Sequence, residues 1–215
     1  MKINKFLKKI GFHSLLITTV LALVSCSNHD DVIKLKNDAT IVAFGDSLTY
    51  GYGAASSDDT YPNKLEKIIG YSVINEGING DTAQAGVKRI RSVVQEHNPD
   101  LVIVSLGGND MLRKQDKNLE ENLSKIVDYL ISRNIQVVLL AEPQPSMAFL
   151  VSSLNDAEVY QKVANKYNIP LIENVFSKYL ADYKYKSDTI HLNSKGYELV
   201  AEDVAQELKS FGYID

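Results

Sequence analysis

The stretch TIVAFGDSLTYGYG, residues 40–53, begins as an apolar run and then changes abruptly to glycine and polar residues. The run lacks the alternation of apolar and polar residues that a half-exposed strand shows, so it is typical of a strand covered on both faces. In open parallel sheets, ligands bind beyond the carboxyl ends of the strands. Asp46 and Ser47 follow such an end, which makes this turn a candidate functional site.

Four more short apolar runs follow along the chain, and longer segments with helical spacing separate them. One such segment carries apolar residues three or four positions apart: Leu123, Ile126, Val127, Leu130 and Ile131. The last segment repeats this spacing from Tyr197 to Phe211. The alternation predicts an α/β fold in which helices cover both faces of a parallel sheet. The five expected strands span residues 40–45, 71–77, 101–107, 135–141 and 169–174.

Two further polar clusters follow the second and third apolar runs. They are NEGINGDT, residues 75–82, and GGND, residues 107–110. A single polar turn is usually structural. Three of them at the carboxyl ends of parallel strands should meet at one edge of the sheet, and together they indicate a site.

The inventory of metal-binding side chains is small. His13 and His29 lie near the amino terminus, and Cys26 is the single cysteine of the chain. The expected domain therefore holds only His97 and His191, and a zinc site built from His and Cys ligands is excluded. We expect no metal and no cofactor.

The two remaining histidines have different surroundings. His97 stands near the end of a predicted helix, where a solvated His is favoured by the helix dipole. His191 follows Asp188 by three residues and precedes the last helix, whose N-cap we expect at Asn193 or Ser194. This spacing can bring a carboxylate against one imidazole nitrogen and leave the other nitrogen free. A serine hydroxyl needs such a carboxylate-oriented base, so Ser47, His191 and Asp188 can supply nucleophile, base and orienting group.

The motifs FGDSLTYGYG, GINGDT, GGND and DTIH occur in this order. They resemble the four motif blocks of the GDSL-type SGNH hydrolase superfamily, and their spacing is most similar to its arylesterase, lysophospholipase and acyl-thioesterase branch. The resemblance extends from Thr40 to the end of the chain. It implies a three-layer α/β/α sandwich with a five-stranded, flavodoxin-like parallel sheet. It also implies a serine hydrolase that cleaves acyl esters.

The resemblance implies roles for individual residues. Ser47 would be the nucleophile, with Asp188 and His191 completing the triad, and the Ser47 N–H, Gly80 and Asn109 would form the oxyanion hole. Glycine and asparagine suit an oxyanion hole, because a glycine N–H can approach the oxyanion closely and a neutral amide donor does not titrate. Asp46 is expected to be a structural partner within the turn. Leu192 departs from the pattern, since many relatives have proline there, and this affects the shape of the turn.

Other functions are possible at such a sheet edge. A phosphate or flavin site lacks support, because neither a Gly-x-x-x-x-Gly-Lys string nor a dinucleotide fingerprint is present. A binding module without catalysis would lack a motif residue, and none is missing. Within the enzyme class, a carbohydrate O-acetylesterase acting on envelope glycans would use the same triad and remains the alternative.

The acyl group has a candidate binding segment after the fourth strand. Residues 142–154, EPQPSMAFLVSSL, contain two prolines followed by a run of apolar residues. Such a run is either packed into the core or lines a groove, and in the resembling branch the loop here shapes the acyl site. We expect Met147, Phe149 and Leu150 to bind substrate and to favour medium or longer acyl chains.

The chain begins with a basic and then apolar segment. Four lysines precede the stretch from Ile10 to Val24, which is too short and one-sided for a convincing membrane span. The stretch ends in LVSC at Cys26, which resembles the lipobox of bacterial lipoproteins, in which the cysteine is lipidated. An ordinary cleaved signal is the alternative.

We therefore expect a lipoprotein signal peptide over residues 1–25, a tether over 26–38 and an SGNH hydrolase domain over 39–215. Ordinary globular composition, with 45% hydrophobic and 23% charged residues, supports one domain. Removal of residues 1–25 takes the formal charge from −4 to −8, because it deletes four lysines and no acid. Such a domain is a poor match for nucleic acid. We expect a monomer in the bacterial cell envelope, either held on the periplasmic side by a lipid on Cys26 or free in the periplasm.

Overall fold

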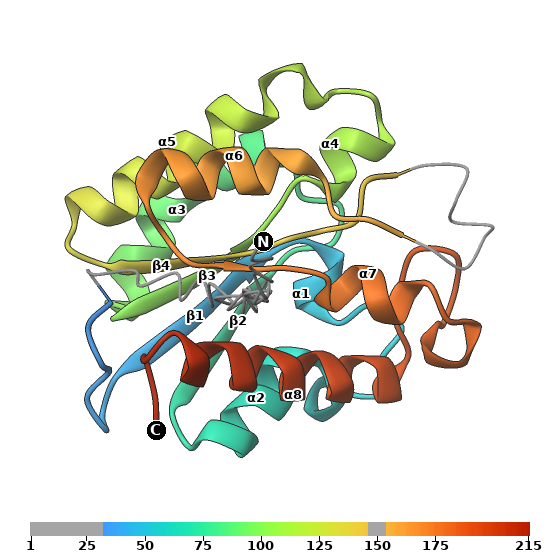
Figure 1. Cartoon of the computed structure of the whole chain (residues 1–215), viewed down its shortest axis with the longest axis horizontal. Helices are drawn as coiled ribbons and strands as arrows, with labels where there is room; N and C mark the ends of the chain where they lie inside the picture. Colours follow the sequence, from blue (N-terminus) through green and yellow to red (C-terminus); the bar gives the residue numbers. More distant parts are fainter. Residues whose placement is uncertain (1–31, 146–153) are drawn as a thin grey trace, which may run out of the picture.

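The computed structural model of the chain describes residues 32–145 and 154–215. A five-stranded sheet lies between two layers of helices (Figure 1), and its strands are all parallel in the order β2-β1-β3-β4-β5. The strands are β1 (Thr40–Gly45), β2 (Ser72–Gly77), β3 (Leu101–Ser105), β4 (Gln136–Leu140) and β5 (Leu171–Ile172). This is the three-layer α/β architecture that the sequence predicts.

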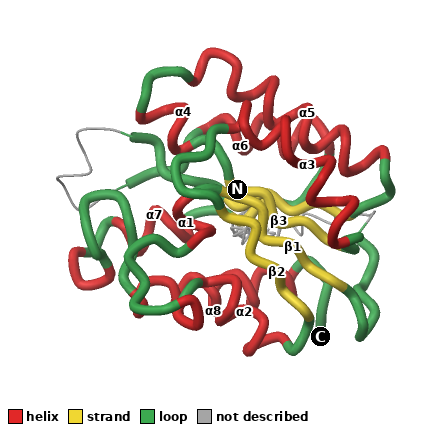
Figure 2. Tube along the Cα trace, turned by 180° about the vertical axis from the view of Figure 1, so that it is seen from behind, coloured by secondary structure: helices red, strands yellow, loops and turns green. Residues whose placement is uncertain are grey.

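Helices cover both faces of the sheet (Figures 1 and 2). One layer consists of α3 (Ala83–His97), α5 (Leu119–Ser132) and α6 (Glu158–Tyr167), and the other of α2 (Tyr61–Ile69), α7 (Val175–Leu180) and α8 (Ser194–Ser210). Alternate residues of β1 belong to different cores: Ile41 and Ala43 to one, Val42 and Phe44 to the other. Burial on both sides explains why β1 is apolar throughout.

The remaining elements are short. Helices α1 (Ser47–Tyr50) and α4 (Gly108–Leu112) follow β1 and β3 almost directly, and the 3-10 turns are η1 (Ser57–Asp59), η2 (Asp116–Asn118) and η4 (Tyr183–Tyr185). Since the strands are parallel, α1 and α4 both lie at the carboxyl edge of the sheet. That edge carries the candidate site.

Some predicted boundaries were wrong. The fifth strand has two residues instead of the six expected, because Pro170 cannot donate to a ladder and the chain leaves the sheet after Ile172. The third strand ends at Ser105, and Gly107 caps α4 with φ 139°. On α5, Ile131 is 43% exposed rather than part of the buried face, since it lies one residue before the end of the helix.

Part of the expected tether lies against the domain. Leu35 is buried, and its N–H donates to the carbonyl of Tyr213 at 2.8 Å. Ile33 exchanges two hydrogen bonds with the side chain of Gln136, at 2.7 and 2.8 Å. Residues 33–35 are therefore bound at the amino-terminal edge of the sheet, opposite the candidate site.

Candidate active site

Ser47 stands at the first turn after the central strand β1. Asp46 caps α1 by accepting a hydrogen bond from the N–H of Leu48 at 2.9 Å. Gly45 leaves no space for a side chain, since a Cβ there would overlap Oγ1 of Thr49 and lie 2.6 Å from the carbonyl oxygen of Ser105. The strand can therefore turn sharply into the helix, which presents Ser47 at the edge of the sheet.

The structure brings together Ser47, His191 and Asp188. Nε2 of His191 lies 3.0 Å from Oγ of Ser47, and Nδ1 lies 2.8 Å from Oδ2 of Asp188. The other carboxylate oxygen of Asp188 accepts the backbone N–H groups of Ile190 and His191, both at 2.9 Å. The short turn thus holds the carboxylate and the imidazole in one geometry. The last helix begins as expected, with Asn193 as its N-cap.

The charge of Asp188 suits the tautomer that the hydrogen bonds require. Burial disfavours its ionisation, but the hydrogen bonds from His191 and from the Ile190 N–H outweigh burial and hold the pKa of Asp188 below its usual value. An ionised Asp188 accepts a proton-bearing Nδ1, so Nε2 is left to accept from the Ser47 hydroxyl. Such an arrangement can activate a serine nucleophile.

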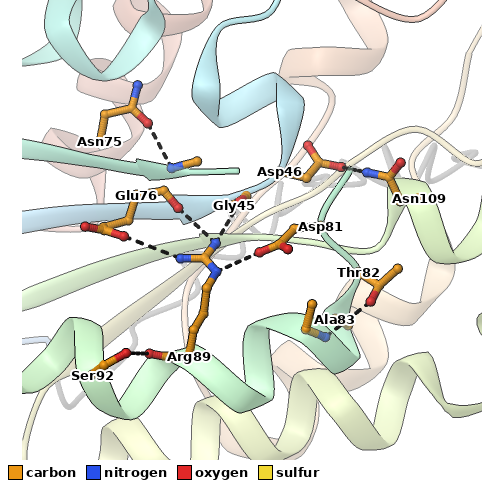
Figure 3. Close-up of polar contacts among 12 residues, drawn as sticks. Gly45, Asp46, Asn75, Glu76, Asp81, Thr82, Ala83, Arg89, Ser92 and Asn109 are labelled. Atoms are coloured by element: carbon orange, nitrogen blue, oxygen red, sulfur yellow. Dashed lines mark hydrogen bonds and ion pairs between the residues drawn. The ribbon is translucent and has the colours of Figure 1, made fainter. Parts of the chain in front are cut away.

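Gly80 and Asn109 line the same cavity as Ser47 and His191, and the cavity has a volume of about 250 Å³. Nδ2 of Asn109 donates to Oδ2 of Asp46 at 2.7 Å (Figure 3), and Nη2 of Arg113 donates to Oδ1 of Asn109 at 3.3 Å. Both ends of the amide are therefore held. A primary amide has two N–H donors, and the second one remains for an oxygen in the cavity.

Most of the other residues that line the cavity are apolar. Tyr52 forms part of one wall, where its ring centroid lies 4.5 Å from that of His191. The remaining apolar lining consists of Leu48, Leu112, Pro143, Pro145, Leu180 and Ile190. The cavity thus combines polar groups around Ser47 with walls that suit a hydrocarbon chain.

Asp46 is the structural partner that the sequence predicts. Its side chain is buried and joins the Ser47 turn to Asn109 on α4. Burial raises its pKa to about 7, and the charges of Asp81 and Asp110 add to this effect, while the hydrogen bonds from Leu48 and Asn109 oppose it.

Sequence reasoning missed Arg89, which braces the loop that carries Gly80. Its guanidinium donates to Oδ2 of Asp81 at 2.6 Å and to the carbonyls of Gly45 and Glu76, both at 2.9 Å (Figure 3). It also lies over the Phe44 ring, 3.9 Å from the centroid. Arg89 thereby ties the ends of β1 and β2 to the Gly80 loop. No local sequence signal marks an arginine in the middle of a helix for this role.

The prediction for His97 was wrong. Its Nε2 lies 2.7 Å from Oε1 of Glu76, and its side chain is only 15% exposed. Glu76 is near the carboxyl end of β2 and faces α3, so the imidazole has a partner in the protein instead of solvent.

Several predicted residues lie outside the described ranges: Met147, Phe149 and Leu150 fall within 146–153, and Cys26 within 1–31. Across residues 32–145 and 154–215, no group of three or more His, Cys, Asp or Glu side chains could hold a metal ion. Within the same ranges, no helix has both the length and the apolar character needed to cross a membrane.

Comparisons with known proteins agree with the motifs and the fold. Residues 43–199 match the model of the GDSL-like lipase/acylhydrolase family. The chain is 29% identical over 179 residues to thioesterase 1/protease 1/lysophospholipase L1 of Escherichia coli (strain K12), covering 79% of this chain and 83% of that protein. It is 30% identical over 180 residues to an arylesterase of Vibrio mimicus, covering 78% and 87% of the two chains.

Solved structures show the same architecture. The crystal structure of TesA superposes with a TM-score of 0.70 at 26% identity, and the match covers 80% of this chain and 99% of that one. The family match, the identity to named esterases and the shared fold all agree with the motif order. The chain therefore belongs to the GDSL-like lipase/acylhydrolase family, and it is an SGNH-type esterase that hydrolyses acyl esters.

Proposed function

We propose that this esterase acts through an acyl-enzyme on Ser47, with His191 as general base and then general acid. Asp188 orients the imidazole, and the Ser47 N–H, the Gly80 N–H and the amide of Asn109 are the oxyanion donors. The observation that carries this proposal is the series of contacts from Ser47 Oγ to His191 Nε2 and from His191 Nδ1 to Asp188, at 3.0 and 2.8 Å. These contacts occur beside a cavity that Gly80 and Asn109 also line.

The reaction follows from these roles. Oγ of Ser47 attacks the ester carbonyl while Nε2 of His191 takes its proton, and the carbonyl oxygen becomes an oxyanion held by the three donors. The C–O bond to the alcohol then breaks, and His191 returns the proton to the leaving oxygen. Water next attacks the acyl-serine with His191 again as base, which releases the acid and restores the serine.

We further propose that the preferred substrates are esters of medium or longer fatty acids rather than acetyl groups on sugars. The apolar lining by Leu112, Leu180 and Ile190 supports this choice, because each buried methylene contributes about 0.8 kcal/mol to binding at most. A sugar acetate would leave most of these walls without a partner.

A chain-length profile tests the substrate proposal. The experiment compares kcat/KM for p-nitrophenyl esters from acetate to dodecanoate, beside an acetylated oligosaccharide. We expect kcat/KM to rise with chain length, and Leu112→Ala to reduce it more for long esters than for short ones. Ile131→Ala is the matched control, because Ile131 is also 43% exposed but lies on α5, away from the cavity. Fastest turnover of the acetylated oligosaccharide would favour an O-acetylesterase instead.

A further inference from the structure

Glu142 is a buried acid at the active-site edge to which the triad gives no role. It lies two residues beyond the end of β4 and is 1% exposed. Its Oε2 accepts the N–H of Gly108 at 2.6 Å, and its Oε1 is 2.9 Å from the hydroxyl of Ser105. Glu142 also lines the cavity that contains Ser47. A fully buried carboxyl is costly in its charged form unless it is paired and hydrogen-bonded.

The contact with Gly108 fixes the backbone that presents Asn109. Gly108 begins α4, and Asn109 is the next residue. Two residues before Gly108, the carbonyl of Leu106 accepts a hydrogen bond from the hydroxyl of Tyr160 at 3.1 Å. Glu142 therefore holds the N–H immediately before Asn109. A displacement of this turn would move the Asn109 amide relative to Ser47.

Two carboxyl groups converge on this turn. A Cβ on Gly108 would overlap Oε2 of Glu142 and lie 3.5 Å from Oδ2 of Asp46. The groups that interact electrostatically with Glu142 include two other acids, Asp46 and Asp110. Its hydrogen-bond partners are the hydroxyl of Ser105 and the N–H of Gly108. In the part of the chain that the structure describes, neither Asp46 nor Glu142 forms an ion pair with Lys, Arg or His. Two adjacent buried anions without a cation are unfavourable, so this pair retains a proton.

The surroundings of Glu142 favour its uncharged form. Burial raises its pKa well above the usual value, and the neighbouring Asp46 adds to the effect, while hydrogen bonds from Ser105 and Gly108 oppose it. A protonated Oε1 keeps the contact with Ser105, because a hydroxyl can accept as well as donate. Oε2 remains an acceptor for Gly108.

We propose that Glu142 is a positioning residue for ester hydrolysis, acting as an uncharged acid that anchors the Gly108 N–H and thereby directs the Asn109 amide toward the oxyanion. This inference rests on the proposed role of Asn109. It makes the hydrogen-bond acceptor at position 142 essential and its negative charge dispensable.

A pair of variants separates these two properties. Glu142→Gln keeps a neutral acceptor of the same shape, whereas Glu142→Met has similar size but leaves the part-buried Gly108 N–H without this partner. We expect Glu142→Gln to keep kcat within about threefold of wild type, and Glu142→Met to lower kcat at least about tenfold with little change in KM, since small misplacements of catalytic groups can cost about a hundredfold. Glu173, an exposed acid that follows β5, supplies controls in Glu173→Gln and Glu173→Met.

Each outcome decides the proposal. Equal losses of kcat in both Glu142 variants would show that the negative charge is required. Wild-type kcat in both variants would show that the hydrogen bond to Gly108 is not required. Either result overturns the proposal. If Glu142→Met does not fold, infrared spectra of wild type and Glu142→Gln still decide. Asp46, with a pKa of about 7, can contribute a carbonyl band of a protonated carboxylic acid in both proteins at neutral pH, so wild type should show a larger band than Glu142→Gln, and equal bands overturn the proposal. Activity of a folded Ser47→Ala variant would instead overturn the proposed function itself, together with this inference.

Discussion

Ser47 and His191 are 144 residues apart in the sequence, yet their side chains lie 3.0 Å apart. The contact depends on two local devices, the sharp turn after β1 and the short turn from Asp188 to His191. Both were visible in the sequence as polar residues next to a strand end or a helix start. At this scale the types of residue and their spacing predicted which side chains would meet.

The proposed roles predict the cost of removing each side chain. We expect His191→Ala to lower kcat at least about a thousandfold, because triad members act as a unit. Asn109→Ala should cost on the order of a hundredfold, the typical loss for one oxyanion donor, and Asp188→Ala should lie between the two. Steady-state kinetics on one p-nitrophenyl ester measure all three.

Asn118→Ala is the control for Asn109, because Asn118 precedes α5 without forming a side-chain cap. An Asn109→Ala variant as active as this control would remove Asn109 from the oxyanion hole.

The buried acids predict how stability depends on pH. The pKa of Glu142 is raised in the folded state, so its contribution to stability is complete below its unfolded pKa near 4.5 and is lost as the pH rises toward the folded pKa. Asp46, with a pKa raised to about 7, acts in the same direction. We expect Glu142→Gln to gain stability relative to wild type as the pH rises from about 4.5 to neutrality, measured by urea denaturation. A difference that does not change with pH would contradict the raised pKa.

Among the elements, α3 carries the brace that connects the strand ends to the Gly80 loop. Arg89 contacts Asp81, Gly45 and Glu76 with a planar set of donors that lysine cannot reproduce. We expect Arg89→Lys to lower the free energy of unfolding by about 3 kcal/mol, because it leaves a largely buried network incomplete. Arg91→Lys, on an exposed position of the same helix, should change it by less than about 0.5 kcal/mol. Equal effects of the two substitutions on the free energy of unfolding would show that the contacts of Arg89 contribute no more to stability than those of an exposed arginine.

The elements also show what the sequence could and could not predict. The central strands β1, β3 and β4 were found because they are apolar runs, a composition that buried parallel strands require. The edge strand β2 was found too, but it carries Ser72, Asn75 and Glu76 and is only partly buried, so the expectation that it is covered on both faces was wrong. The end of β5 was misplaced, since β propensity does not report where a neighbouring strand stops pairing. Arg89, Glu142 and the partner of His97 were missed because their contacts join distant segments. An acid after an apolar run, such as Glu142, shows its position at the sheet edge but not its burial.

For the whole molecule, the amino-terminal segment predicts a lipid anchor. We propose that residues 1–25 are a signal peptide and that Cys26 becomes the lipidated first residue of an envelope protein, because a basic start and a short apolar run precede this single cysteine. Cells that express the chain and are fed an alkyne fatty acid should incorporate the label into wild type and not into Cys26→Ala. Equal labelling of both would rule out Cys26 as the site.

In the proposed reaction, the acyl group is transferred to Ser47 before water releases it. Acid quenching of wild-type enzyme during turnover of a slowly deacylated p-nitrophenyl ester, followed by peptide mass spectrometry, tests this transfer most directly. The peptide containing Ser47 should gain the mass of the acyl group, and Ser47→Ala, still folded, should show neither this gain nor a burst of nitrophenol. An acyl adduct on another residue, or a burst that persists in Ser47→Ala, would contradict the transfer to Ser47.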